Sequence, residues 1–177
     1  VASGTASDPL ALTVGVNNIP VVVTAPNGTT LRTYTVAVTR EAWKGPFYVD
    51  PAAGSDTNPC DTWGAGHACA TIAGAVGKAV LPNTTIYLTG TVHTVNSVSS
   101  SLSLNFVGAG KDTTIINGTG GSRAFNMTGG STNVTFRDLT VQNASLTSGN
   151  GAAINAAGTL SLTNVGILSN TTTSGAG

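Results

Sequence analysis

A stretch of this chain repeats at an interval of 26 residues, and this repeat restricts the possible folds more than any other feature. Residues 111–119 can be laid over residues 137–145, and the same shift then reaches residues 163–171. The alignment places like residues in columns. One column is apolar and contains Ile115, Val141 and Ile167. Another is polar, lies at a turn and contains Asn117 and Asn143. Antiparallel sandwiches have no reason to repeat side chains at a long fixed interval.

A period in the mid-twenties fits one coil of a parallel β-solenoid. Neighbouring coils pair about 4.8 Å apart, so like residues stack in ladders. From residue 83 onward no helical period appears, and short apolar segments are separated by Gly and Asn. We predict a right-handed parallel β-helix of about four coils over residues 83–177, with the apolar column pointing inward.

The first part of the chain has a different hydrophobic periodicity. Residues 10–40 alternate apolar and polar side chains with a period of two, which indicates half-buried antiparallel strands. Three runs are predicted as strands, residues 10–16, 21–23 and 34–38, and the last two form a hairpin. Turns are expected at Asn17-Asn18 and at Pro26-Asn27-Gly28.

The segment from Leu12 to Thr30, followed by Tyr34-Thr-Val-Ala-Val-Thr-Arg40, resembles the C-terminal half of a bacterial cadherin-like β-sandwich domain. The resemblance implies a partial antiparallel sandwich module over residues 1–41, of a kind found as a surface module without catalytic residues. We expect the chain to begin part-way through such a domain, with the first half of the sandwich absent, so that the apolar faces of these strands need an opposing sheet.

Residues 42–82 are predicted to be a linker and an N-terminal cap for the solenoid. In a secreted chain Cys60 and Cys69 would form a local disulfide, whereas in the cytosol they would be two isolated thiols. A helix is expected over residues 70–81, with Thr71 able to cap its start and Pro82 ending it. Such a helix would cover one open end of the coils.

This cap resembles that of secreted pectate-lyase-like β-helix proteins, in Tyr48-Val-Asp-Pro, Gly54-Ser-Asp and Cys69-Ala-Thr-Ile72. The segment from Gly151 to Asn164 is similar to repeats of bacterial surface β-helices, including the polymorphic outer-membrane proteins. The resemblances cover roughly residues 47–177. The expected fold is therefore all-β: a partial antiparallel sandwich, then a parallel β-helix with one short capping helix.

The charge composition excludes several classes of partner. Only 8% of residues are charged, and seven basic residues balance seven acidic ones. Nucleic acids and anionic membranes both call for a basic face, and no apolar run is long enough for a membrane span. A surface rich in Thr, Ser and Asn is typical of extracellular β proteins. We expect an extracellular bacterial location, without nucleic-acid binding or membrane insertion.

Pectate-lyase-like folds often cleave acidic polysaccharides, which takes several carboxylates, with or without calcium. Beyond residue 83 the only carboxylates are Asp112 and Asp138, which share a column beside Lys111 and Arg137. Asp112, Asp138 and Arg137 could form a calcium or substrate site, or the corner could be a surface ladder of alternating charges.

Other candidate ligands lie in and near the cap. Acidic and amide side chains at residues 50–61 could bind calcium, or could simply be solvated loop residues. His67 and His93 are expected in loops or at the surface rather than as general bases. We predict no cofactor beyond this possible calcium, and no catalytic residue.

Two functions remain open from the sequence. The first is a structural or adhesive bacterial surface protein within a fibrous or multimodular assembly, with flanking modules, further copies of itself or glycans as partners. The second is a β-helix that binds or cleaves polysaccharides. Neither end of the chain completes its own fold, so two accounts are expected. Either the chain is a piece of a longer surface protein whose remaining sequence completes both ends, or neighbouring copies complete each other by strand donation at one end and coil stacking at the other.

Overall fold

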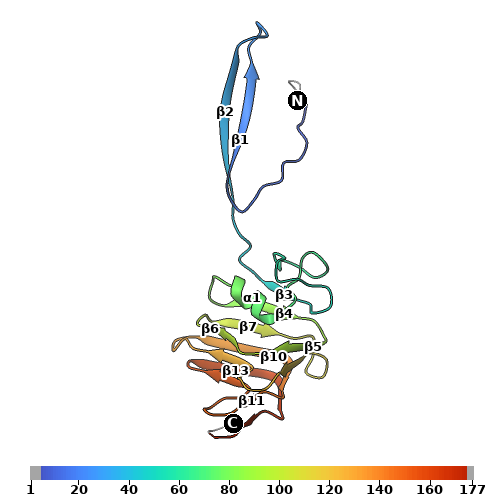
Figure 1. Ribbon diagram of the computed structural model, residues 1–177, viewed down its shortest axis with the longest axis vertical. Helices are drawn as coiled ribbons and strands as arrows, with labels where there is room; N and C mark the ends of the chain where they lie inside the picture. Colours follow the sequence, from blue (N-terminus) through green and yellow to red (C-terminus); the bar gives the residue numbers. More distant parts are fainter. Residues whose placement is uncertain (1–4, 175–177) are drawn as a thin grey trace. The chain divides into compact units, whose positions relative to one another are not determined.

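A computed structural model describes residues 5–174 of the chain (Figure 1). The chain divides into two compact units, Val1–Trp43 and Lys44–Gly177. The first contains a small antiparallel sheet. The second is a parallel β-solenoid of about three turns with one short helix, so the predicted all-β class is confirmed, with one coil fewer than expected.

The N-terminal unit contains a long hairpin. Strand β1 (Gly15–Thr24) pairs antiparallel with β2 (Leu31–Arg40). The predicted turn after Pro26 is present, since the Asn27 carboxamide accepts hydrogen bonds from the backbone N–H groups of Thr29 and Thr30 at 3.1 and 3.0 Å. The predicted turn at Asn17-Asn18 is wrong, because β1 runs straight through both residues.

One face of the hairpin is apolar. Directly opposite residues share a face, so Ile19 with Val36 and Val21 with Tyr34 form cross-strand apolar pairs. All three of Val21, Tyr34 and Val36 are exposed. A two-stranded sheet is marginal without a layer against its apolar face. That an opposing sheet covers this face stays a prediction.

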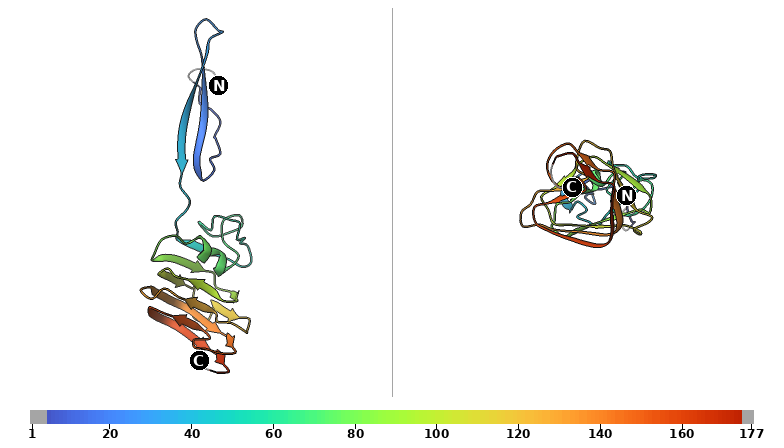
Figure 2. Two further views of the ribbon diagram at one scale, coloured as in Figure 1. Left: turned by 60° about the vertical axis from the view of Figure 1, so that its left-hand side comes forward. Right: turned by 90° about the horizontal axis from the view of Figure 1, so that it is seen from below.

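The solenoid has three walls of parallel strands (Figures 1 and 2). The first wall contains β3 (Phe47–Val49), β4 (Thr84–Leu88), β7 (Leu104–Val107) and the first halves of β10 (Asn133–Gln142) and β13 (Thr159–Leu168). The second contains β5 (Val92–Val95), β8 (Ile115–Gly118) and the second halves of β10 and β13. The third contains β6 (Val98–Ser100), β9 (Phe125–Met127) and β12 (Ile154–Ala156). Strands β11 (Ser145–Leu146) and β14 (Thr171–Thr172) pair with each other in a separate short parallel sheet.

The predicted register is correct for the last pair of coils and wrong by one residue for the pair before it. Val141 lies beside Ile167, as the 26-residue shift requires. On its other side, however, Val141 lies beside Ile116, not Ile115. Ile116 is fully buried, while Ile115 is half-buried in the opposite orientation. The inward column continues to His93, which lies beside Ile116.

The change of register has its origin at the corner between the first two walls. Strand β10 turns this corner through one residue, Asp138, with φ of 56°, and β13 does so at Asn164, with φ of 52°. This left-handed backbone conformation is one that Asp and Asn adopt more readily than most residues. The preceding coil makes the same corner with a loop, residues 108–114, between β7 and β8.

The polar column of Asn117 and Asn143 is also offset by one residue from the predicted register. Asn117 lies beside Gln142 in the ladder rather than beside Asn143. The Asn143 carboxamide nevertheless donates a hydrogen bond to the Asn117 carboxamide oxygen at 2.8 Å. The two asparagines thus meet at the turn, as predicted, although they are offset by one residue.

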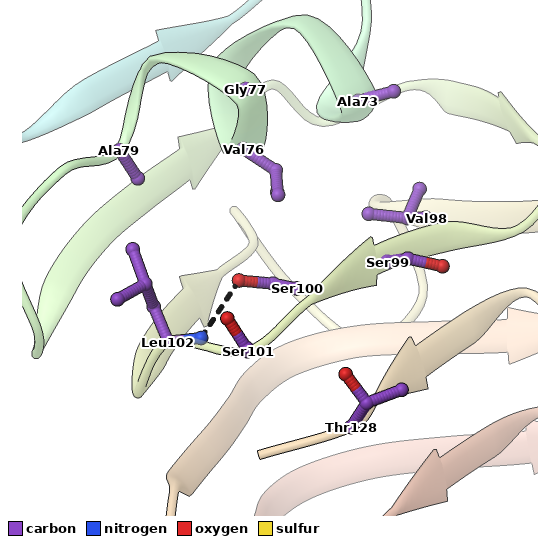
Figure 3. A pocket seen from close by; sticks show the side chains of 10 residues that line it. All are labelled: Ala73, Val76, Gly77, Ala79, Val98, Ser99, Ser100, Ser101, Leu102 and Thr128. Atoms are coloured by element: carbon purple, nitrogen blue, oxygen red, sulfur yellow. Dashed lines mark hydrogen bonds between the residues drawn. The ribbon is translucent and has the colours of Figure 1, made fainter.

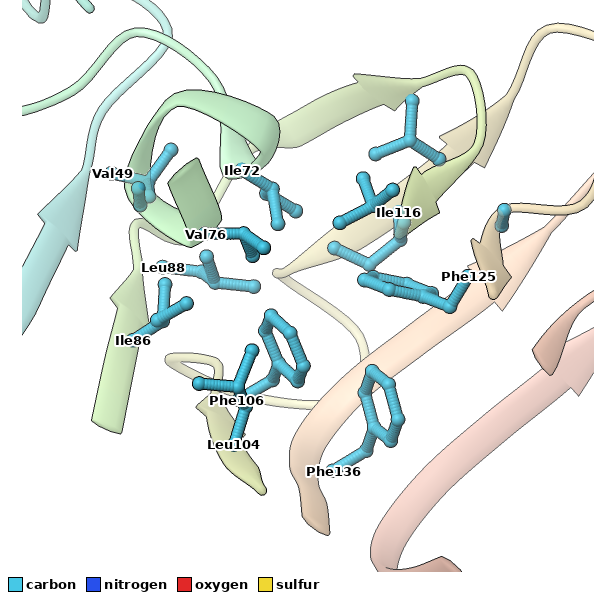
Figure 4. Close-up of a cluster of buried hydrophobic side chains, with 14 of the residues drawn as sticks. Val49, Ile72, Val76, Ile86, Leu88, Leu104, Phe106, Ile116, Phe125 and Phe136 are labelled. Atoms are coloured by element: carbon cyan, nitrogen blue, oxygen red, sulfur yellow. The ribbon is translucent and has the colours of Figure 1, made fainter. Parts of the chain in front are cut away.

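The core fills the interior of the coils (Figure 4). Phe106 and Phe136 occupy equivalent positions on β7 and β10 and stack with ring centroids 4.8 Å apart. Phe125 of the third wall packs against both, at 5.1 and 4.8 Å. All three side chains are inaccessible to solvent, so each contributes the free energy of removing a large apolar surface from water.

Helix α1 (Ile72–Lys78) covers the first coil and is shorter than predicted. Thr71 caps it as expected, with its hydroxyl accepting a hydrogen bond from the Gly74 N–H at 2.9 Å. Ile72, Ala75 and Val76 face the core. Val80, which lies within the predicted helix of residues 70–81, is 63% exposed because the helix has ended before it.

Candidate functional site

The corner predicted as a calcium or substrate site does not bring its residues together as a column. Asp112 lies on the exposed turn within the loop 108–114, whereas Asp138 is the corner residue inside β10. The predicted equivalence of Asp112 and Asp138 is therefore wrong, for the same reason as the column of Ile115: the two coils turn this corner with segments of different length.

Each carboxylate at this corner is bonded to a neighbour. Asp112 forms an ion pair with Lys111. Asp138 accepts a hydrogen bond from the Asn164 carboxamide at 2.7 Å on one oxygen, and its other oxygen lies 3.3 Å from the Arg137 Nε. Surface ion pairs of this kind contribute about 0–1 kcal/mol each. These are two separate surface pairs, and the ladder of alternating charges, which needs Asp112 and Asp138 in one column, is not formed at this corner.

The cap carboxylates also make local bonds. Asp50 accepts hydrogen bonds from the backbone N–H groups of Ala52 and Ala53, and Asp61 bonds the His67 imidazole at 3.0 Å. Asp56 reaches the start of α1, where it accepts from both the N–H and the hydroxyl of Thr71, at 2.9 and 2.7 Å. Within residues 5–174 no group of three His, Cys, Asp or Glu side chains is placed to hold a metal ion.

Asp56 gives a first test of this cap. Replacing Asp56 with alanine removes two hydrogen bonds and a negative charge from the N-terminus of α1. We expect a loss of about 1–2 kcal/mol in the free energy of unfolding, measured by urea denaturation. Asp112→Ala is the matched control, since that side chain is 85% exposed and forms a surface ion pair with Lys111. Equal losses in the two variants would contradict the assignment.

A disulfide closes the cap loop. Cys60 and Cys69 are bonded, as predicted for a secreted chain. The loop is further held to the solenoid, because the Tyr48 N–H donates to the Cys60 carbonyl at 3.0 Å and the Cys69 N–H donates to the Tyr48 carbonyl at 2.9 Å. Strand β3 thus lies between the cap loop and β4 and joins the cap to the first coil.

His93 is buried, contrary to the expectation of a surface or loop position. Only 2% of the residue is exposed. One ring nitrogen, Nε2, lies 3.0 Å from the Thr89 carbonyl, and Nδ1 has no partner among the described residues. Burial lowers the pKa of His93 below its ordinary value, and the Thr89 carbonyl and the charge of Asp50 oppose this only in part.

The lowered pKa predicts acid sensitivity. Because the unfolded chain binds a proton at His93 more readily than the folded one, stability should be full above about pH 6.5 and should fall as pH drops toward the folded-state pKa. The slope attributable to this one group is at most about 1.4 kcal/mol per pH unit. Thermal melts between pH 7.5 and 5 would measure it. His93→Gln should flatten the decline and the exposed His67→Gln should not; a wild-type slope in His93→Gln would contradict the prediction.

An apolar surface lies at the last coil. On β13, Leu160, Leu162 and Ile167 lie beside the fully or almost fully buried Val134, Phe136 and Val141, so they occupy inward positions. Yet they are 37%, 45% and 45% exposed. They line a hollow of about 260 Å³ together with Ala153 and Ile154. The predicted inward orientation of Ile167 is thus confirmed. Ile167 is the last member of its column, however, and one side of it faces solvent.

Leu160 and Leu162 were not among the residues predicted for a site. The 26-residue shift would have found them, because it places them over Val134 and Phe136.

A second hollow, of about 480 Å³, lies between α1 and the turn after β6 (Figure 3). Its floor includes Ser99, Ser100, Ser101 and Thr128, and Val76 faces it from the helix. The Ser100 hydroxyl accepts a hydrogen bond from the Leu102 N–H at 3.0 Å. The lining is neutral throughout, so this hollow offers hydroxyls but no titratable group.

Comparison with known proteins finds a similarity for one part of the chain. No curated protein and no solved structure matches the chain. In the part that the structure describes, no helix is long and apolar enough to cross a membrane. Residues 1–41 match the family of cadherin-like beta sandwich domains.

Proposed function

We propose that the chain is an extracellular structural or adhesive element of a bacterial surface and works within a larger assembly. The cadherin-like match, the disulfide and the neutral solenoid are consistent with that role. The observation that carries the proposal is the apolar surface of β13, where residues in inward positions are open to solvent. Exposed apolar surfaces of this kind mark sites of association.

The surface of β13 has the features of one that another solenoid coil covers. All ten residues of β13 are uncharged, whereas natural strand edges that stay free are usually protected by charges or proline. Each existing coil already shows what covers such a surface: a parallel strand with apolar residues in the same inward positions, as β10 covers β13. In the assembly the last coil of another copy takes this place, with its strand antiparallel to β13.

Helix α1 limits how two copies can meet through their solenoids. It contacts β3, β4, β5 and β6, and so covers the first coil. Contact between coils therefore uses the last coil of each copy, which gives a two-fold, self-complementary pair. The apolar face of the β1–β2 hairpin provides a second association surface, and two surfaces on each chain allow a fibre to form.

Sedimentation velocity of the purified chain at micromolar concentration tests this proposal. Concentration-dependent association is expected. Leu162→Glu should weaken it by placing a charge on the exposed inward position, whereas Thr163→Glu, on the outward side of the same strand, should not. Both residues are exposed in the single chain, so neither change should unfold it. A wild-type monomer at every concentration would overturn the proposal.

The alternative function, cleavage of a polysaccharide, needs carboxylates free to act. The bonds of Asp138 to Asn164 and Arg137 and of Asp112 to Lys111 favour the structural role instead. Incubation with uronate polymers and calcium separates the two. New unsaturated sugar ends that absorb in the ultraviolet would establish the enzyme.

A further inference from the structure

A row of three aromatic rings lies on the outside of the cap and the first coil. Tyr48 of β3 and Tyr87 of β4 are direct neighbours in the ladder, and both alternate with buried residues, so their side chains point outward. Their rings stack with centroids 5.4 Å apart. Trp63, from the disulfide loop, extends the row, with its ring 4.9 Å from that of Tyr48 in an edge-to-face arrangement.

A hollow opens beside the last ring of this row. It has a volume of about 320 Å³, and Tyr87 is one of its walls. Thr85, two residues before Tyr87 on β4, faces the same side and also lines it. The rim at Asn83 is held in place because the Asn105 carboxamide donates a hydrogen bond to the Asn83 carbonyl at 3.0 Å. Lys44 is the one charged residue in the lining.

We propose that the aromatic row (Tyr48, Trp63, Tyr87) and the adjoining hollow bind successive neutral pyranose units of a polysaccharide. A pyranose has a face of C–H groups, which are attracted to the negative face of an aromatic ring, and an edge of hydroxyls, which need polar partners. The site offers both, in the exposed ring of Trp63 and in the hydroxyl and amide groups of the hollow. The volume is at the lower end of the range typical of small-ligand sites, about 300–1,000 Å³.

The exposure of Trp63 favours binding over a purely structural role. The loop that carries Trp63 is already held by the Cys60–Cys69 disulfide and by the two backbone hydrogen bonds to Tyr48. Even so, Trp63 remains 43% exposed. A tryptophan needed only to hold the loop would gain more by burying its ring.

This inference deepens the adhesive form of the proposed function by naming its ligand class. Its test is independent of assembly, because the aromatic row and the surface of β13 share no residue. If the chain associates but binds no sugar, this inference fails alone; if it binds sugar but stays monomeric, the assembly proposal fails alone.

Affinity electrophoresis of the full chain in gels containing galactomannan, xylan or hydroxyethylcellulose provides the test. Retardation by at least one of these neutral polymers is expected. Trp63→Ala and Tyr87→Ala should each weaken it about tenfold or more. Val92→Ala, at an exposed apolar residue of the solenoid outside the row and the hollow, is the control and should bind as the wild type does. Melting temperatures are measured for every variant.

Thr85→Glu provides a second variant if an aromatic substitution disturbs folding, because it adds a bulky charged group to the wall of the hollow without removing a ring. It should also abolish retardation. The inference is overturned if no neutral polymer retards the wild type, or if folded Trp63→Ala binds unchanged. Retardation by polygalacturonate alone would also overturn it, since that result would assign binding to the charge of Lys44.

Discussion

Replacing Ile116 with aspartate is expected to unfold the solenoid unit at room temperature. The Ile116 side chain is fully buried between His93 and Val141 in the inward column. An aspartate there would place a carboxylate in an apolar interior without a partner. The cost of several kcal/mol is comparable to the whole stability of a typical domain, about 5–15 kcal/mol. Loss of the near-ultraviolet circular dichroism signal, or of the cooperative thermal transition, would report the effect.

The matched control is the adjacent residue. Ile115→Asp places the same charge on a half-buried, outward-facing side chain, which can turn into water. We expect this variant to stay folded with a moderately lowered melting temperature. The pair decides between the two registers, since a 26-residue shift at this coil predicts the opposite ranking. If Ile115→Asp unfolded the chain and Ile116→Asp did not, the observed register would be wrong.

Sequence patterns predicted the elements whose causes are local. The alternation through Val21 and Val36 identified the hairpin, because a period of two and a Pro-Asn-Gly turn depend only on near neighbours. Thr71 was identified as the helix cap for the same reason. The turn predicted at Asn17 failed because cross-strand pairing decides there: Asn17 lies opposite Val38 in the ladder, and its carboxamide donates a hydrogen bond to the Val38 carbonyl at 3.3 Å.

The register between coils depends on loop length, which side-chain patterns report poorly. Val141 and Ile167 are 26 residues apart and Ile116 and Val141 are 25 apart, but Phe106 and Phe136, also neighbours in the ladder, are 30 apart. A solenoid tolerates such changes because loops leave the coil at its corners while the walls stay paired. The most regular interval in the sequence therefore describes only the last pair of coils.

The candidate sites were less predictable than the fold, because burial and pairing decide them. The shift of 26 residues put Asp112 and Asp138 in one column, although one lies on a loop and the other at a corner. His93 looked like an isolated polar residue, yet its position beside Ile116 puts it in the core. The aromatic row joins residues from β3, β4 and the disulfide loop, and no sequence interval relates Trp63 to Tyr87.

Phe136→Ala is the second large effect that we expect. The Phe136 ring is fully buried, stacks on Phe106 with an interplanar angle of 12° and meets Phe125 at 68°. Truncation removes both ring contacts and leaves a cavity that the paired strands on either side cannot close. The expected loss is about 3–5 kcal/mol in the free energy of unfolding, measured by urea denaturation. Leu168→Ala is the control, since Leu168 is 53% exposed and its truncation should change stability by less than about 0.5 kcal/mol.

The position of Phe136 also decides how the loss is distributed along the solenoid. Each coil is stabilised mainly by its neighbours, and Phe136 lies on β10, between β7 on one side and β13 on the other. We therefore expect Phe136→Ala to separate unfolding into two transitions, with β13 lost at lower urea concentration than the coils beneath α1. Hydrogen exchange would follow this directly: amides of β13 should lose protection more than those of β4. Equal loss of protection in both strands would instead show that the coils unfold as one cooperative unit.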